Sequence, residues 1–277
     1  MHEDFIELQY NSILKHVKGD YEYMIFNNGS DNAQLKRNED MCNKLNIRCV
    51  NINTNNFNDP SNIAGEALNE MFKYLKNESI FKIDSDMFFM SDIDLGNLMS
   101  DADIIYIPTF TPNIEWMWSG IFGLNTKITG MPHNCRPVPS KGDTFIESHH
   151  LLDNQNNSRK KINLFGLQSF NGDSMITSCN NDCGIYFDKN GDITYIEKPN
   201  FEVKYNLTNI NLYRKYLEIS KIMTDYGFPR PYNIDVITVD GLNTIFHFKS
   251  SNHNDMYRDL KYTKNKKRAL VELLNEN

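Results

Sequence analysis

The residues best suited to chemistry in this chain are two aspartates, Asp84 and Asp86, with Ser85 between them. The apolar run at 80–83 leads into this triplet and predicts a strand that ends there. Side chains two positions apart on a strand share a face and lie about 6.5–7 Å apart along it. Two carboxylates so placed at a strand terminus could hold one hard divalent cation that also binds a diphosphate. Because ligands of open α/β sheets bind beyond the strand ends, the triplet is the first candidate for a functional site.

Two other interpretations of the triplet differ in strength. An EF-hand loop that began at Asp84 would need glycine at its sixth position and glutamate at its twelfth, where this chain has Phe89 and Leu95. That interpretation is excluded. Two solvated acids at a turn are the other alternative, and the triplet alone leaves it open. For the nearby Asp92 and Asp94 we expect a loop role, such as capping a helix at 95–100, rather than metal binding.

Composition limits the class of protein. The 277 residues suit one large α/β domain, and 40% hydrophobic residues can bury a core. A net charge of -7 without a long basic run argues against a nucleic-acid partner. No apolar run approaches the roughly 18 residues of a transmembrane span, and the N-terminal sequence does not resemble a signal peptide. We therefore expect a soluble cytoplasmic protein, whose five cysteines, without a C-x-x-C pair, are reduced and mostly buried.

The elements that must position the triplet alternate between helical and strand patterns. The expected helices span 5–18, 32–45 and 62–76, and the expected strands span 21–26, 47–52 and 80–83. This β-α-β-α-β alternation predicts a parallel, Rossmann-like sheet flanked by helices.

The rest of the chain predicts further strands, one hairpin and a long loop. Expected strands lie at 104–107, 113–124, 184–187, 192–196 and 244–248, and expected helices at 209–225 and 254–275. The turn at 188–191 indicates a hairpin. The segment 130–160 is too long for a simple connection, which predicts either a functional loop or a partly ordered one. As a functional loop it would close over a bound ligand. We expect a single domain over 1–277.

Three patterns occur in a recognisable order. A strand runs into Asn27-Asn28-Gly29-Ser30-Asp31, and the helix before the triplet's strand opens with Asn62-Ile-Ala-Gly65-Glu-Ala-Leu-Asn69. The triplet continues as Asp84-Ser85-Asp86-Met87-Phe88. Together they resemble the donor loop, the N-x-x-G-x-A-x-N helix and the D-S-D-x-F metal site of nucleotide-sugar glycosyltransferases of the GT-A fold, particularly family-2-like and family-8-like members. The likeness covers residues 5–125 best. GT-A domains open with a strand before their first helix, whereas this chain starts almost at that helix, so the contacts to the donor base stay open.

The resemblance implies a mostly parallel GT-A sheet with a C-terminal helical extension at 251–277. Residues 1–125 would bind the nucleotide sugar and 126–250 the acceptor. The implied reaction transfers a hexosyl or pentosyl group from a UDP- or GDP-sugar to a hydroxyl of a glycan or protein, with Mn²⁺ or Mg²⁺ at the diphosphate. Asp86 would bind the metal directly, and Asp84 would bind it through water or hold the ribose.

Other site residues are expected around this centre. Asn28, Asp31 and Asn69 would touch ribose or phosphate, with turn and helix-face roles as an equal alternative. At least one of Trp116 and Trp118 would form an acceptor wall, although both could also belong to the core.

A general base is expected only if the reaction inverts the configuration at the anomeric carbon of the sugar. Asp182, just before a hairpin strand, is the candidate, with Asp143 and Glu147 as competitors. A retaining enzyme would not need this base, and the residues do not decide between the two outcomes.

A C-terminal element completes the expected centre. Residues 244–254 resemble the H-[FY]-x-x-x-S-N-W-type element of GT-A enzymes, whose histidine completes the metal shell. We expect His247 to be a metal ligand and His253, which stands where the tryptophan often is, not to be one. Lys249 points the same way as His247 along the strand and would offset diphosphate charge. A half-buried His247 bonded within the sheet is the alternative.

Two other functions compete with the glycosyltransferase. A sugar nucleotidyltransferase should carry an early glycine-rich triphosphate loop with Arg or Lys, and none is visible here. A non-catalytic carbohydrate-binding protein is the other candidate, and it would not hydrolyse nucleotide sugars. The oligomeric state stays open.

Overall fold

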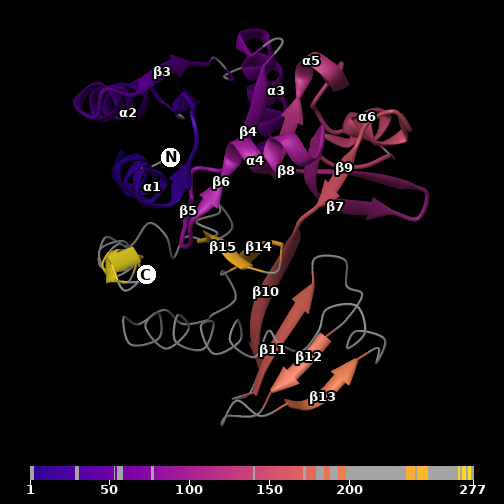
Figure 1. The fold of residues 1–277 in the computed structure, drawn as a ribbon. Coiled ribbons are helices and arrows are strands. Elements are labelled where there is room, and N and C mark those ends of the chain that lie inside the picture. Colours follow the sequence, from indigo (N-terminus) through magenta and orange to yellow (C-terminus); the bar gives the residue numbers. More distant parts are fainter. Residues whose placement is uncertain are drawn as a thin grey trace. The chain divides into compact units, whose positions relative to one another are not determined.

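The computed structural model describes most of the N-terminal part of the chain and shorter stretches of the C-terminal part (Figure 1). The described residues are 3–28, 31–52, 54, 59–75, 78–139, 141–170, 173–178, 184–187, 193–197, 235–240, 242–248, 268, 270–272 and 274–275. The chain divides into two compact units. The first comprises Met1–Ser85 and Asp92–Ile162, and the second comprises Asp86–Ser91 and Asn163–Asn277. The first unit therefore extends beyond the predicted donor half at 1–125.

Three long helices of the first unit confirm the helical spacing in the sequence. They are α1 (Glu3–His16), α2 (Asn32–Lys44) and α3 (Pro60–Tyr74). Asp31 and Asp59 cap α2 and α3, because each side chain accepts a hydrogen bond from a backbone N–H in the first turn. The predicted start of the third helix near residue 62 was two residues late, since Pro60 occupies the first turn, where a missing N–H costs nothing.

Shorter elements complete the helical part of the first unit. They are α4 (Leu95–Asp101), α5 (Thr126–Thr129), the 3₁₀ turn η1 (Ile146–Ser148) and α6 (His149–Asp153). Asp94 caps α4 through a hydrogen bond from the Asn97 N–H at 2.9 Å, which confirms its predicted loop role. The predicted long loop at 130–160 thus contains η1, α6 and the beginning of a strand, β9 (Arg159–Lys161).

The strands of the first unit form three small sheets. β1 (Val17–Lys18) pairs with β6 (Ile93–Asp94), and β2 (Met24–Asn27) pairs with β3 (Arg48–Asn51), both in parallel. The third sheet has the order β4-β8-β7-β9, with β4 at Ser79–Ile83, β8 at Ile114–Asn125 and β7 at Ile104–Thr111.

The second unit contains one seven-stranded sheet with the order β13-β12-β11-β10-β14-β15-β5. Its strands are β5 (Met87–Phe89), β10 (Asn163–Phe170), β11 (Asp173–Ser178), β12 (Gly184–Phe187), β13 (Ile193–Glu197), β14 (Asp235–Val239) and β15 (Leu242–His247). The antiparallel pairing of β12 with β13 confirms the predicted hairpin.

The fold is mixed α/β, as predicted, but the expectation of a mostly parallel sheet was wrong. Among the described strand pairings, three are parallel and eight are antiparallel. The reason is the length of the connections: β7 and β8 are joined by a tight turn, and a tight turn can only return the chain in the opposite direction.

The core of the first unit is aromatic where the third sheet meets the segments that cover it. Phe122 stacks on Phe145 with ring centroids 4.7 Å apart, and Phe72 lies 6.2 Å from each. Cys42 and Cys135 are buried free thiols and Cys49 is a partly buried one, as predicted, while Cys179 and Cys183 lie outside the described residues.

Two predicted C-terminal helices fall largely outside the described residues. The helix expected at 209–225 is not among them, and of the one expected at 254–275 only residues 268, 270–272 and 274–275 are described, all helical. Within the described residues, no helix combines the length and apolar character that crossing a bilayer requires.

Candidate functional site

The aspartate triplet follows β4, as predicted, but it does not continue that strand. β4 ends at Ile83, Ser85 and Asp86 form a turn, and β5 begins at Met87. The expectation that Asp84 and Asp86 share one strand face was therefore wrong, because the chain turns between them. Asp84 belongs to the first unit and Asp86 to the second.

Asp86 lies beside His247 in the second unit. The Asp86 Oδ1 is 3.5 Å from the His247 Nε2, and the two residues are only 7% and 6% exposed. Strand pairing explains why residues so distant in sequence meet: β15 runs antiparallel to β5, with His247 opposite Met87. The Phe248 N–H donates to the Asp86 carbonyl at 2.8 Å and extends this register by one step.

The surroundings of this pair are apolar. Met87, Phe88 and Phe246 are fully buried, and Phe248 is 1% exposed. In such surroundings a carboxylate is costly unless a cation or hydrogen-bond donors stabilise it. A cation bound beside Asp86 would be attracted to its carboxylate.

The geometry of the pair fits a shared cation. Two cis ligands that each lie about 2.1 Å from one metal ion are separated by roughly 3.0 Å in octahedral and 3.4 Å in tetrahedral geometry. The observed 3.5 Å between Oδ1 and Nε2 is close to this range. Carboxylate oxygen and neutral imidazole nitrogen are both competent ligands for Mn²⁺, so Asp86 and His247 could hold such an ion together.

Asp84 has a different partner, which sequence reasoning missed. Its Oδ1 accepts a hydrogen bond from the Lys82 ammonium, two residues earlier on β4. The same ammonium donates to the carbonyls of Ser119 at 2.6 Å and Gly120 at 3.2 Å on β8. Lys82 thus has its three donors engaged and links β4, β8 and Asp84. A lysine two positions before an aspartate in the sequence was the available signal.

Of the polar residues expected to bind the donor nucleotide sugar, Asp31 and Asn69 accept hydrogen bonds from backbone N–H groups of the first unit. Asp31 accepts from the Gln34 N–H at 2.8 Å as the cap of α2, and Asn28 is half-buried at the end of β2. The Asn69 Oδ1 accepts from the Cys135 N–H at 2.8 Å, so Asn69 ties α3 to the segment that follows α5. These contacts match the turn and helix-face alternative, and contacts to ribose or phosphate stay predictions.

The neighbour of Asn28 forms a buried network that the sequence did not reveal. Asn27 is 1% exposed and donates to the Leu35 carbonyl at 3.0 Å and to the Asn51 side chain at 2.8 Å. The Asn38 amide donates to the Asn27 Oδ1 at 2.9 Å. This network fixes the end of β2 against α2 and β3, next to the predicted donor loop.

The two tryptophans occupy different environments in the first unit. Trp116 is 4% exposed and belongs to the core, whereas Trp118 is partly exposed. The Trp118 ring covers Gly120 so closely that a Cβ there would meet it at 2.5 Å. The glycine therefore makes room for this ring. Trp118 is the one of the pair that keeps an exposed surface for an acceptor wall.

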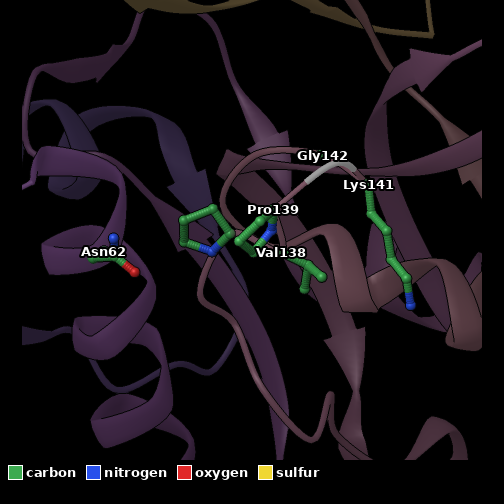
Figure 2. Close-up of a pocket in the computed structure, with 6 residues that line it drawn as sticks. Asn62, Val138, Pro139, Lys141 and Gly142 are labelled. Atoms are coloured by element: carbon green, nitrogen blue, oxygen red, sulfur yellow. The ribbon is translucent and has the colours of Figure 1, made fainter.

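A pocket of about 570 Å³ lies in the first unit beside the start of α3 (Figure 2). Asn62 lines one side, and the turn formed by Pro137, Val138, Pro139, Lys141 and Gly142 lines the other. Proline and valine carbons with one amide and one ammonium suit a small molecule that has both an apolar face and polar groups.

Gly65 of α3 is required for the position of this turn. A Cβ at Gly65 would meet the Arg136 Cα at 2.5 Å and the Cys135 carbonyl oxygen at 2.6 Å. Gly65 belongs to the helix pattern that resembles the glycosyltransferases, and its role in the structure is this close approach of α3 to the chain at 135–136.

Several other predicted site residues can be placed. Asp143 accepts from the Thr144 N–H at 2.7 Å, and Glu147 lies 3.2 Å from the His150 Nε2. Asp182, Lys249 and His253 lie outside the described residues, so their expected roles stay predictions.

The pKa values of three groups in the first unit are shifted, and the cause differs between the buried thiols and the exposed aspartate. Burial raises the pKa of the Cys135 thiol to about 12, which keeps it protonated and unreactive. A hydrogen bond with Cys49, together with burial, raises the pKa of Cys42 as well. The Lys18 ammonium and then His16 lower the pKa of the exposed Asp92, so this aspartate acts as an ion-pair partner, consistent with its predicted loop role.

Comparison of the chain with models of known protein families, with curated proteins and with solved structures yields no match.

Proposed function

We propose that this protein is a metal-dependent glycosyltransferase of the GT-A type, which transfers a sugar from a nucleoside diphosphate sugar to a hydroxyl group of a glycan or protein. The observation that carries the proposal is the buried pair of Asp86 and His247, whose Oδ1 and Nε2 atoms are 3.5 Å apart. The motif resemblance suggested both residues as metal ligands, and their proximity in the second unit supports that role.

The chemistry of the reaction explains why such a pair is useful. As the bond from the sugar carbon to the diphosphate breaks, negative charge grows on the leaving diphosphate. A bound Mn²⁺ or Mg²⁺ stabilises this charge as a Lewis acid. Asp86 supplies a carboxylate and His247 a neutral imidazole to hold the ion, and their apolar surroundings strengthen the attraction between carboxylate and cation.

The remaining roles follow the motif resemblance, and two of the residues have described contacts. Asp84 is held by Lys82, and in the proposal it reaches the donor ribose or a metal-bound water, because its carboxylate already has a cationic partner. Lys249 offsets diphosphate charge and Trp118 offers its exposed ring face to the acceptor. Asp182 is the proposed base of an inverting reaction.

A thermal-shift panel tests the proposal. UDP, GDP and their common sugar conjugates are added to the full chain with and without Mn²⁺. A ligand at a hundred times its Kd stabilises the folded state by about 2.7 kcal/mol, so the correct donor should raise the Tm clearly and only when Mn²⁺ is present. No donor-dependent shift in any arm would contradict the proposal.

Hydrolysis separates the competing functions. A glycosyltransferase should slowly release free sugar and nucleoside diphosphate from its donor when Mn²⁺ is present, whereas a carbohydrate-binding protein should release neither. A sugar nucleotidyltransferase should instead be stabilised by a nucleoside triphosphate and should form a nucleotide sugar from a sugar 1-phosphate. Formation of that product would replace the proposed function with this alternative.

A further inference from the structure

A second group of metal-ligating side chains lies in the first unit, on α6. In the described part of the chain, His149, His150 and Asp153 are the one group of three or more His, Cys, Asp or Glu residues whose ligand atoms all lie within 4.8 Å of one another. From this geometry we infer that the three residues form a binding site for a borderline divalent cation such as Zn²⁺, independent of the proposed centre at Asp86.

Helix geometry brings the three ligands together. His149 and Asp153 are four residues apart and His150 and Asp153 three apart, the two spacings that place side chains as neighbours on one helical face. The two imidazole rings have centroids 3.8 Å apart. Ligand atoms of one tetrahedral cation lie about 3.4 Å apart, so small rotations of these side chains complete the site.

The His149 ring is already oriented for coordination. Its Nδ1 lies 2.8 Å from the Ile146 carbonyl oxygen, and because a carbonyl only accepts, Nδ1 carries the proton. With the proton on Nδ1, Nε2 is the ring nitrogen left to bind a cation. A backbone carbonyl that fixes the other ring nitrogen in this way is a usual feature of metal-binding histidines.

Glu147 acts as a neighbour of the site. Its Oε2 lies 3.2 Å from the His150 Nε2, and its side chain is 20% exposed. This carboxylate orients the His150 ring and adds negative charge near the cation.

The segment that carries the ligands is firmly anchored. Ile146, Ser148 and Leu152 are buried, and the Ser148 hydroxyl accepts a hydrogen bond from the Met117 N–H on β8 at 2.9 Å. Buried anchors thus alternate with outward-facing ligands. A cation held there would join the three side chains of α6 and stabilise this short helix.

The donor set selects the class of metal. Two imidazoles and one carboxylate suit Zn²⁺, Co²⁺, Ni²⁺ or Cu²⁺ better than Mg²⁺ or Ca²⁺, which prefer oxygen ligands. The site therefore differs in preference from a Mn²⁺ centre at the diphosphate.

Co²⁺ titration of the full chain, followed by visible absorption, tests the inference. In Asp86→Asn, which removes a ligand of the proposed centre, the expected result is one Co²⁺ per chain, displaced by Zn²⁺, with the d–d bands of a low-coordinate site and without the intense ultraviolet charge-transfer band of a thiolate ligand. His149→Ala and His150→Ala should each weaken binding by at least about tenfold, and Glu147→Gln by less. The matched control is His133→Ala, which removes an exposed histidine of the same unit outside the group.

Two results would overturn the inference. One is wild-type Co²⁺ binding in the His149→Ala/His150→Ala double variant, and the other is a thiolate charge-transfer band, which would move the ion to a cysteine. Asp86→Asn separates this site from the proposed function: it should keep the Co²⁺ signal, while the double histidine variant should keep Mn²⁺-dependent binding of the nucleotide sugar.

Discussion

Asp84 and Asp86 are separated by one residue in the chain, yet they have opposite surroundings. The Asp84 side chain is 43% exposed and paired with a lysine that also holds two backbone carbonyls. The Asp86 side chain is 11% exposed and lies beside an imidazole. A carboxylate already neutralised by a fixed ammonium has less to gain from a metal ion than a buried one beside a neutral ligand. In this motif the metal function should therefore depend mainly on Asp86.

The largest effect is expected for Asp86→Asn, which keeps the shape of the side chain and removes its charge. Since loss of even an outer-shell partner costs about 10–100-fold in metal affinity, loss of this ligand should weaken Mn²⁺-dependent nucleotide-sugar binding by more than about 100-fold. Titration calorimetry measures this. Asp92→Asn, an exposed aspartate in an ion pair close by in the sequence, is the control and should bind normally. Unchanged binding by Asp86→Asn would remove the metal site from this residue.

His247→Ala should have the next largest effect on Mn²⁺ affinity, a loss of about tenfold or more, because the imidazole is the second ligand beside Asp86. His253→Ala is the matched control and should change the affinity little. Circular dichroism should confirm that both variants fold. Equal effects of the two substitutions would contradict the pairing of Asp86 with His247.

Lys82→Met tests the surroundings of Asp84. The methionine keeps most of the side-chain volume but leaves Asp84 and two carbonyls without their donor, which should destabilise the protein by about 1–3 kcal/mol in urea unfolding. Mn²⁺ affinity should stay within about threefold of the wild type, since the proposed ligands lie elsewhere. If Lys82→Met abolished metal binding as fully as Asp86→Asn, the contrast between the two aspartates would be wrong.

The smallest effect concerns Asp92, whose pKa is lowered by the Lys18 ammonium and by His16. A lowered pKa in the folded state means that the ionised carboxylate stabilises the fold above the unfolded pKa of 3.8, and that this contribution is lost as the pH falls through the lower folded value. Asp92→Asn should therefore be slightly less stable than the wild type near neutral pH, and the difference should shrink in strong acid. Urea unfolding at both pH values measures it, and a difference that grows in acid would contradict the assignment.

Local patterns in the sequence predicted the elements well. The long helices α1, α2 and α3, the hairpin of β12 and β13 and the cap at Asp94 all depend on interactions within a few residues. The pairing of strands was predicted poorly, because a parallel sheet was inferred from alternation alone. Tight connections instead made most pairings antiparallel.

The residues of the candidate site also divide into those that the sequence identified and one that it did not. Asp84 and Asp86 could be selected from the sequence because acidic residues after an apolar run are visible there, and His247 from a resemblance. Lys82 was missed because its role depends on the carbonyls of Ser119 and Gly120, which β8 brings beside β4.

By itself, the sequence determined which residue types are available and which segments form the long helices and the β12–β13 hairpin, since period, caps and turns act over short distances. Only the tertiary structure decided which partner each aspartate has. The register of β15 on β5 places His247 beside Asp86, and the pairing of β4 with β8 places Lys82 beside Asp84 and two carbonyls. Register depends on hydrogen bonds and packing between distant segments, and no local pattern around the triplet contains that information.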